Sequence, residues 1–295
     1  MPHQSIVSLV RRIRDKWHPL FHLRRLRAFR QLLEHFDFPV WVQLYRIPHP
    51  VYIHSARHAS LLVNPFTSEP EIVALFSAVQ QIYTPRVFWD VGAFIGYYSW
   101  LLKGMDNSLE VLLFEPDAVN ISAIQKTLAR SGLTSVHVFH AAVSDSDGEK
   151  IFSLDKITGE TGTLEDPNQS FIKRHYRVDP TLINVRTITI DSVRKSARSV
   201  DLIKIDVEGH EAKVIAGAEQ TILQDYPILI FENFDHNQVI LDGLVGKGYR
   251  LYDAERMSAN HVQTINYLAL PPRCFGTSDL LLEKWREENS SLKRS

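Results

Sequence analysis

Residues 206–211 (DVEGHE) place three carboxylates and one imidazole within six positions, directly after the mostly apolar run 202–205. Acids gathered at the end of a buried strand repel one another, and a bound cation or substrate relieves that repulsion. Histidine titrates near neutrality, so His210 is a candidate general base, with Asp206 and Glu208 as alternatives. The segment therefore predicts a site for proton transfer or cation binding. The plainer alternative is that its acids cap the following helix.

Residues 90–96 (DVGAFIG) contain two glycines where a predicted strand turns into a helix. Glycines at such a turn let a ligand approach the backbone closely. The spacing matches neither the dinucleotide fingerprint nor the phosphate-binding loop. Asp90 at the strand end would repel a phosphate and suits a ligand that carries an amine or another positive charge. The turn is therefore a candidate nucleotide site, with a plain connecting turn as the alternative.

Glu115 follows the next predicted strand, residues 109–114. In sheets of this kind an acid at that position accepts hydrogen bonds from ribose hydroxyls. The neighbouring Asp117 is expected to cap the helix that follows, because aspartate favours that position. The glycine turn and the acid together are more specific than either feature alone.

Glu232 and Asn233 end a later strand that lies beside Asp206 in the predicted sheet. Carboxylate and amide oxygens suit Mg²⁺, so these three residues are a candidate Mg²⁺ site. Direct contact with a substrate and capping of the next helix are the alternatives. His236 and the loop 161–163 (TGT) are weaker candidates for substrate contact, the loop as a lid.

These residues are positioned by strands and helices that alternate from residue 87 onward. The predicted strands are 87–91, 109–114, 136–139, 185–190, 202–205, 228–231, 249–252 and 265–270, and a hairpin is predicted around 151–152. One predicted helix starts at residue 98, and three more cover residues 117–131, 210–224 and 237–247. Such alternation predicts an α/β fold with a doubly wound, mainly parallel sheet that helices cover on both faces.

The N-terminal part differs from this pattern. It reads as two amphipathic helices and short β pieces between prolines, at 5–17, 20–33, 41–45, 51–54 and 61–63. We therefore predict an accessory region over residues 1–68, helical and β, before a catalytic domain over 69–295.

Charge is unevenly divided along the 295 residues. The net charge is −1, but residues 1–35 hold eight basic and two acidic side chains, so this arm carries +6 and the remainder −7. The near-neutral total gives no argument for a nucleic-acid partner. A single cysteine, Cys274, excludes an intrachain disulfide and a cysteine metal cluster, which favours a cytoplasmic location. No apolar run is long enough to span a membrane.

Four segments carry a resemblance to a known family: 90–98 (DVGAFIGYY), 114–116 (FEP), 140–145 (HAAVSD) with Gly148 after it, and 200–211 (VDLIKIDVEGHE). Together they resemble class I S-adenosylmethionine (SAM) dependent methyltransferases, and within them the FkbM family. The resemblance covers roughly residues 69–270. It implies a seven-stranded Rossmann-like sheet with a reversed final hairpin, SAM as methyl donor, and O-methylation of a saccharide or related metabolite.

The resemblance also implies roles for individual residues. Asp90, Gly92 and Gly96 would form the loop under the methionine part of SAM, and Glu115 would hold the ribose. Phe94 stands where the family more often has a small polar residue, which implies a more apolar pocket floor.

Further residues follow from the same resemblance. Ala142 and Val143, with Ser144 or Asp145 beside them, would line the adenine pocket. The catalytic candidates remain Asp206, Glu208 and His210, which would align an acceptor hydroxyl and help to remove its proton.

Two other functions stay open at this level. One is a non-catalytic SAM- or nucleoside-binding module that docks through the basic arm; the other is a methyltransferase acting on protein or RNA. The expected partner is a small-molecule or saccharide acceptor, and no nucleic acid. The arm is compatible with helix packing, a homo-oligomer contact or weak peripheral contact with a membrane.

Overall fold

Seven strands form the central sheet of the computed structural model, in the order β11-β12-β10-β9-β3-β4-β5. They are β3 (Val87–Val91), β4 (Glu110–Glu115), β5 (Val136–His140), β9 (Leu202–Ile205), β10 (Ile228–Glu232), β11 (Arg250–Asp253) and β12 (Asn266–Leu270). Neighbouring strands run parallel except at β12, which is antiparallel to β10 and β11. The predicted doubly wound sheet with a reversed final hairpin is confirmed.

The structure describes residues 26–63 and 69–293, apart from 157, 166, 168–169, 171–172, 175–176, 234–235 and 260–263. Within these ranges, each helix is too short or too polar to cross a bilayer.

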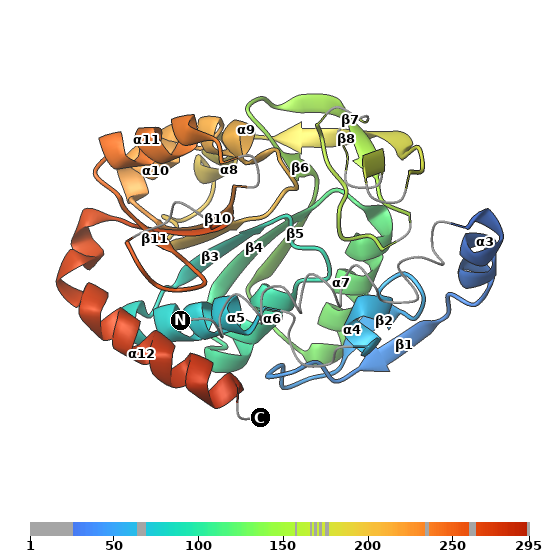
Figure 1. Ribbon diagram of the computed structural model, residues 1–295, viewed down its shortest axis with the longest axis horizontal. Helices are drawn as coiled ribbons and strands as arrows, with labels where there is room; N and C mark the ends of the chain where they lie inside the picture. Colours follow the sequence, from blue (N-terminus) through green and yellow to red (C-terminus); the bar gives the residue numbers. More distant parts are fainter. Residues whose placement is uncertain are drawn as a thin grey trace, which may run out of the picture.

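Helices cover both faces of the sheet (Figure 1). One face carries α5 (Pro70–Tyr83), α6 (Tyr97–Met105), α7 (Ala118–Ser131) and α12 (Ser278–Leu292); the other carries α8 (Ile190–Arg194), α9 (Glu211–Ala216), α10 (Glu219–Asp225) and α11 (Gln238–Gly246). Successive strand residues point to opposite faces, so Phe88 joins one core and Trp89 the other. Both faces are buried, which explains the nearly continuous apolar runs.

A second, smaller sheet corrects the prediction of a hairpin around residues 151–152. Strand β7 (Gly148–Leu154) pairs antiparallel with the distant β8 (Thr181–Ile188), and β8 pairs parallel with β6 (Ala142–Val143). The pairing is therefore long-range, and β8 begins earlier than the predicted strand 185–190.

Two further predictions were wrong. The expected helix 210–224 is divided into α9 and α10 at Gly217, where the chain passes so close to residue 144 that a Cβ would lie 2.1 Å from the Ser144 carbonyl oxygen. Residues 61–63, predicted as β, lie in helix α4 (Ala59–Val63), because the chain turns at 55–58 and continues helically.

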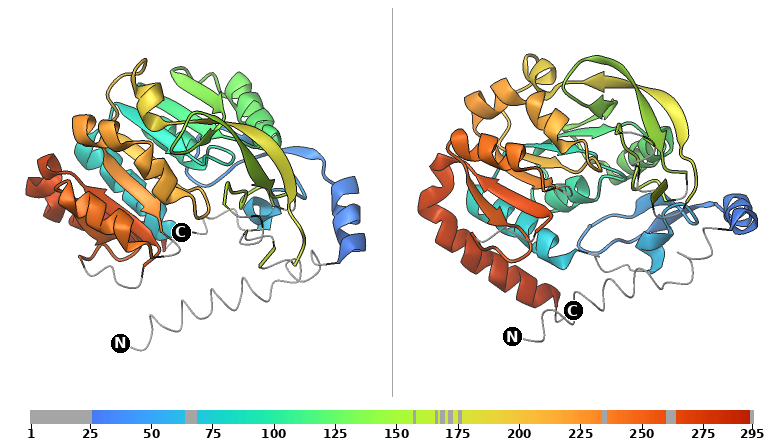
Figure 2. Two further views of the ribbon diagram at one scale, coloured as in Figure 1. Left: turned by 90° about the horizontal axis from the view of Figure 1, so that it is seen from above. Right: turned by 45° about the horizontal axis from the view of Figure 1, so that its top comes forward.

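The N-terminal region contributes α3 (Arg27–His35) and a two-stranded antiparallel sheet of β1 (Pro39–Val42) and β2 (Val51–His54). Figure 2 shows α3 standing apart from the sheet, whereas the buried side chains of β2 belong to the core under α5 and α6. The predicted helix 5–17, and the first part of 20–33, lie outside the described residues. The division at residues 68 and 69 stays a prediction.

Candidate functional site

Four of the predicted site residues lie at the ends of four adjacent strands: Glu115 and Glu232 are the last residues of β4 and β10, and Gly92 and Asp206 follow β3 and β9 directly. Val91 is paired with both Phe114 and Ile205, and Ile205 with Phe231. Gly92, Glu115, Asp206 and Glu232, each one position further on, therefore lie along one edge of the sheet. This edge includes the point between β3 and β9 where the strand order reverses, and ligands bind there in open α/β sheets.

A first pocket opens at this edge beneath the loop that follows β7. Its lining includes the predicted cofactor residues Gly92, Phe94, Glu115, Ala142 and Val143, and the predicted catalytic residues Asp206, Glu208 and His210. Strand β7 supplies Phe152, and the loop supplies Gly159, Glu160, Gly162 and Leu164. Of the predicted lid at 161–163, Gly162 lines the pocket. The sequence analysis did not select the other lining residues of this loop, because they belong to no recognisable motif.

Glu115 is held rigidly at the pocket wall. Its Oε2 accepts the Phe94 N–H at 2.9 Å, and its Oε1 accepts the Asp117 N–H at 2.9 Å. Burial, and after it the charge of Asp117, raises the pKa of Glu115 to about 8. Each carboxylate oxygen has more than one lone pair, so the group can still accept hydrogen bonds from a ligand.

Two residues other than glycine line the pocket with left-handed backbone, Phe94 with φ 54° and Glu208 with φ 55°. Such conformations are unfavourable for residues with a Cβ and are often found at functional sites. The Glu211 carboxylate supports the second turn by accepting the N–H groups of Val207 and Gly209. Both strained positions fall in the two segments that sequence reasoning selected.

Three predicted cofactor residues lie outside the lining of this pocket: Asp90, Gly96 and Asp145. Gly96, with φ 83°, caps α6 and leaves room for the Trp100 indole, which a Cβ would approach to 2.7 Å. It therefore shapes the start of α6.

The other two acids are engaged within the protein. Oδ2 of the fully buried Asp90 accepts a 2.6 Å hydrogen bond from Ser99 Oγ. Asp145 forms ion pairs with Lys150 at 2.6 Å and Lys213 at 3.0 Å, and these partners lower its pKa. The apolar residues before Asp145, rather than its carboxylate, reach the pocket.

His210 lines the pocket with both ring nitrogens engaged. Nδ1 lies 2.6 Å from Glu165 Oε1, and Nε2 lies 2.9 Å from Ser144 Oγ. Burial lowers the pKa of His210, and Glu165 opposes that effect. The imidazole thus joins three separate segments. Glu165 was missed by the sequence analysis because no local pattern links it to His210.

Lys204 was also missed, although a lysine inside a buried strand is itself a signal. Its ammonium lies 3.1 Å from Asp206 Oδ2, 3.7 Å from Asp90 Oδ1 and 3.2 Å from the carbonyl oxygen of Gly92. Burial alone would lower the pKa of Lys204, but the two carboxylates outweigh it and raise the pKa. The lysine stays charged and ties the ends of β3 and β9 together.

A second pocket lies on the other side of Asp206, which lines both. Its polar lining consists of Glu69, Tyr98, Lys204, Asp206, Glu232 and Asn266, and its apolar lining of Ile72, Phe76, Ile205, Ile230 and Phe231. Tyr98 Oη donates to Glu69 Oε2 at 3.0 Å.

The carboxylates of the second pocket are poorly solvated. Burial first, and then the charge of Asp206, raises the pKa of Glu69 to about 6 and that of Glu232 well above its usual value. Additional negative charge is therefore unfavourable in this pocket.

The Mg²⁺ site predicted at Asp206, Glu232 and Asn233 stays a prediction, and two of its residues already have partners within the protein. The Asn233 amide braces the start of α11: its Oδ1 accepts the Asn237 N–H at 2.8 Å. Across the described part of the chain, no group of three or more histidine, cysteine, aspartate or glutamate residues is arranged to hold a metal ion. The positive charge beside Asp206 comes from the Lys204 ammonium. The predicted contact residue His236 is exposed and lies outside both pockets.

Comparison with known proteins gives one family match. The model described as the methyltransferase FkbM domain matches residues 90–251. No match was found among curated protein sequences.

Three solved structures are similar in part. The FkbM methyltransferase from Methylobacillus flagellatus KT is 16% identical, with 72% of this chain and 60% of that one covered and a TM-score of 0.42. A precorrin-6y C5,15-methyltransferase from Geobacter metallireducens is 11% identical, with 61% and 71% covered and a TM-score of 0.37. A methyltransferase from Geobacter sulfurreducens is 13% identical, with 72% and 83% covered and a TM-score of 0.39.

Proposed function

This chain belongs to the FkbM methyltransferase family, and we propose that it transfers the methyl group of SAM to a hydroxyl of a saccharide or related metabolite. The observation that carries the proposal is that two pockets of different chemistry meet at Asp206. A two-substrate transfer needs donor and acceptor sites that adjoin, because the reacting atoms must come within about 3–3.5 Å in line.

The first pocket has the chemistry that SAM requires. SAM, when bound, supplies an electrophilic methyl group on a positively charged sulfur. Glu115 would accept hydrogen bonds from the ribose, and the apolar surfaces of Ala142 and Val143 suit the adenine ring. Asp206 and Glu208 would offset the positive charge.

The second pocket suits a neutral acceptor. Tyr98, Asn266 and the carboxylates can bond hydroxyl groups, and the apolar lining can contact the C–H face of a ring. A phosphate or carboxylate on the acceptor would be repelled by the negative charge of Asp206. Lys204 is the one cation in the described lining, and it already pairs with Asp206 and Asp90. We therefore expect neither nucleic acid nor a phosphorylated sugar as acceptor.

Asp206 is the best-placed base of the three candidates. It adjoins both pockets, its side chain is 32% exposed, and Lys204 holds one of its oxygens. His210 would have to give up its contact with Ser144 or Glu165 to accept a proton. Asp206 would take the hydroxyl proton as the oxygen attacks, while His210 would brace the cofactor pocket.

We place the reaction in the cytoplasm, because the sole cysteine is a buried thiol and cytoplasmic proteins rarely rely on disulfides. The basic arm would serve helix packing or contact between copies of the chain.

Two measurements test the proposal. Calorimetric titration with S-adenosylhomocysteine should show binding; a failure to bind at high ligand concentration would remove the proposal. Incubation of saccharide and metabolite extracts with SAM labelled in its methyl group, followed by mass spectrometry, should show label on a hydroxyl oxygen. Label found only on nitrogen or on RNA would contradict the acceptor class.

A further inference from the structure

The wall behind the cofactor pocket includes a segment that lies outside the matched family domain, residues 57–60. Arg57 is buried and its guanidinium pairs with the carboxylate of Asp117, which lines the pocket and caps α7. The same guanidinium lies over Gly159 of the loop after β7, where a Cβ would come within 2.5 Å of Nε. Arg57 therefore touches two separate segments that line the pocket, the start of α7 and the loop after β7.

His58 and Ser60 extend the same contact. The fully buried His58 lies with Nε2 3.2 Å from Asn120 Oδ1, and its ring is perpendicular to that of Phe94 with the centroids 5.1 Å apart. Asn120 in turn donates to the carbonyl oxygen of Gly159 at 2.9 Å. Ser60 donates to the carboxylate of Glu160 in the loop.

The electrostatic arrangement gives Arg57 a further effect. Asp117 and Glu115 are adjacent buried carboxylates, and the charge of Asp117 raises the pKa of Glu115. Burial raises the pKa of Asp117, and Arg57 is the main group that opposes this. Without Arg57, the buried Asp117 carboxylate would lie uncompensated beside Glu115, the proposed ribose-binding acid. Either one of these two carboxylates would take up a proton or the pocket would change shape.

We propose that Arg57 is a positioning residue for the cofactor: it holds Asp117 beside Glu115 and holds the loop at Gly159 over the pocket, where Ser60 adds a bond to Glu160. The proposal rests on the proposed binding of SAM. It assigns part of the cofactor site to the N-terminal region, whose sequence pattern indicated only an accessory role. Arg57, His58 and Ser60 act on groups that line the pocket rather than on the ligand.

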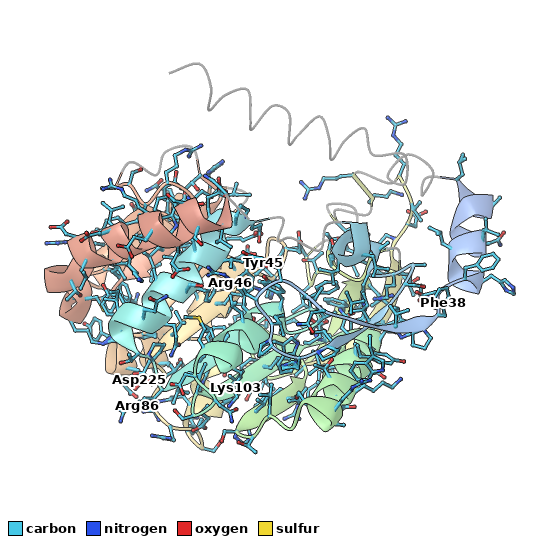
Figure 3. The ribbon with its side chains drawn as sticks, turned by 90° about the horizontal axis from the view of Figure 1, so that it is seen from below. Phe38, Tyr45, Arg46, Arg86, Lys103 and Asp225 are labelled. Carbon is cyan, nitrogen blue, oxygen red and sulfur yellow. The ribbon has the colours of Figure 1, made fainter. Side chains whose placement is uncertain are left out.

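The test uses the full chain and titrates S-adenosylhomocysteine into the wild type, Arg57→Met, Arg57→Lys and Ser60→Ala. Arg46→Met is the matched control, because Arg46 also joins the N-terminal region to the body through an ion pair, with Glu288 at 2.7 Å. Arg46 bonds Ser77 of α5 and Glu288 of α12, lies beside these helices in Figure 3, and is not among the residues that line the first pocket. Hydrogen exchange of the loop after β7 is measured in the free and bound protein.

We expect Arg57→Met to raise Kd about tenfold or more, Arg57→Lys to recover part of that loss, and Ser60→Ala to raise Kd about threefold. Loop exchange should rise in Arg57→Met and stay unchanged in Arg46→Met. Wild-type affinity and loop exchange in Arg57→Met would overturn the inference and leave the proposed function standing. If Arg57→Met does not fold, wild-type affinity of Ser60→Ala for S-adenosylhomocysteine would overturn the inference instead. Absence of binding by the wild type would overturn the proposed function and the inference together.

Discussion

The ammonium of Lys204 lies 3.1 Å from Asp206 Oδ2, at the boundary between the two pockets. One buried cation thus holds the proposed base, compensates Asp90 and bonds the backbone of Gly92 in the cofactor loop. Lys204 lies in β9 and Asp206 comes directly after its end, where the Asp206 N–H still bonds the Val91 carbonyl oxygen, so strand alternation brings both side chains to the same face of the sheet.

Lys204→Met should lose both stability and turnover, because it leaves two carboxylates without their cation. The expected cost is about 3 kcal/mol in the free energy of unfolding, and a kcat lowered about a hundredfold. Denaturant titration and steady-state kinetics measure the two effects. Lys204→Arg is the matched variant and should recover part of both. A turnover within twofold of the wild type in Lys204→Met would contradict this role of the lysine.

Asp206→Asn should separate catalysis from binding. It keeps the shape of the side chain and removes the proton acceptor, so kcat should fall about 10²–10⁴-fold while the Kd for S-adenosylhomocysteine changes by only a few fold. His210→Gln should instead weaken binding, because the imidazole braces the pocket through Ser144 and Glu165. Normal turnover by Asp206→Asn would show that the base is assigned to the wrong residue.

Cofactor binding should release a proton near neutral pH. The pKa of Glu115 is about 8 in the free protein, and ribose hydroxyls bind its ionised form best. The affinity for S-adenosylhomocysteine should therefore increase as the pH rises from about 6 to about 8, with proton release visible as heats that depend on the buffer. Glu115→Gln should bind weakly at every pH and release no proton.

The raised pKa of Glu115 also makes the stability of the free protein fall as the pH rises, whereas cofactor affinity increases. The folded protein keeps the Glu115 proton at pH values where the unfolded chain has lost it, so this group destabilises the free protein as the pH rises from about 4.5 towards 8. The melting temperature of Glu115→Gln relative to the wild type should therefore be higher at pH 8 than at pH 5. An equal difference at both pH values would show that Glu115 does not hold its proton in the folded state.

The enzyme should prefer a neutral acceptor to an anionic one of the same shape. We expect kcat/KM to fall at least about tenfold when a neutral sugar is replaced by its phosphorylated or uronic acid form, because each adds negative charge beside Asp206 and Glu69. Equal rates for neutral and anionic acceptors would place the acceptor outside the second pocket.

Excess chelator should leave the activity unchanged. Asn233 is committed to the start of α11, and Lys204 provides the positive charge beside Asp206. Activity is measured after treatment with EDTA, and again after Mg²⁺ is added back. A loss of activity that Mg²⁺ restores would contradict this expectation.

The sequence alone was sufficient for the sheet and for the edge where the site lies. Short apolar runs that alternate with helical segments identified the buried strands, and residues at or directly after the end of a strand reach its carboxyl edge whatever surrounds them. Gly92, Glu115 and Asp206 were found for this reason. Gly96 was selected from the glycine turn and Asp145 from the family resemblance, but their contacts depend on Trp100 and on two lysines, which local spacing does not specify.

Only the tertiary structure decided how distant segments complete the site. It brought Arg57 to Asp117, Glu165 to His210, and the ends of α5 and β12 into the second pocket. It also divided the predicted helix 210–224 at Gly217, where the Asp191 carboxylate from α8 accepts the N–H groups of Gln220 and Thr221 at the start of α10. The physical reason is common to all of these: backbone preference is local and can be read along the chain, whereas packing and charge pairing depend on which segments the fold brings together.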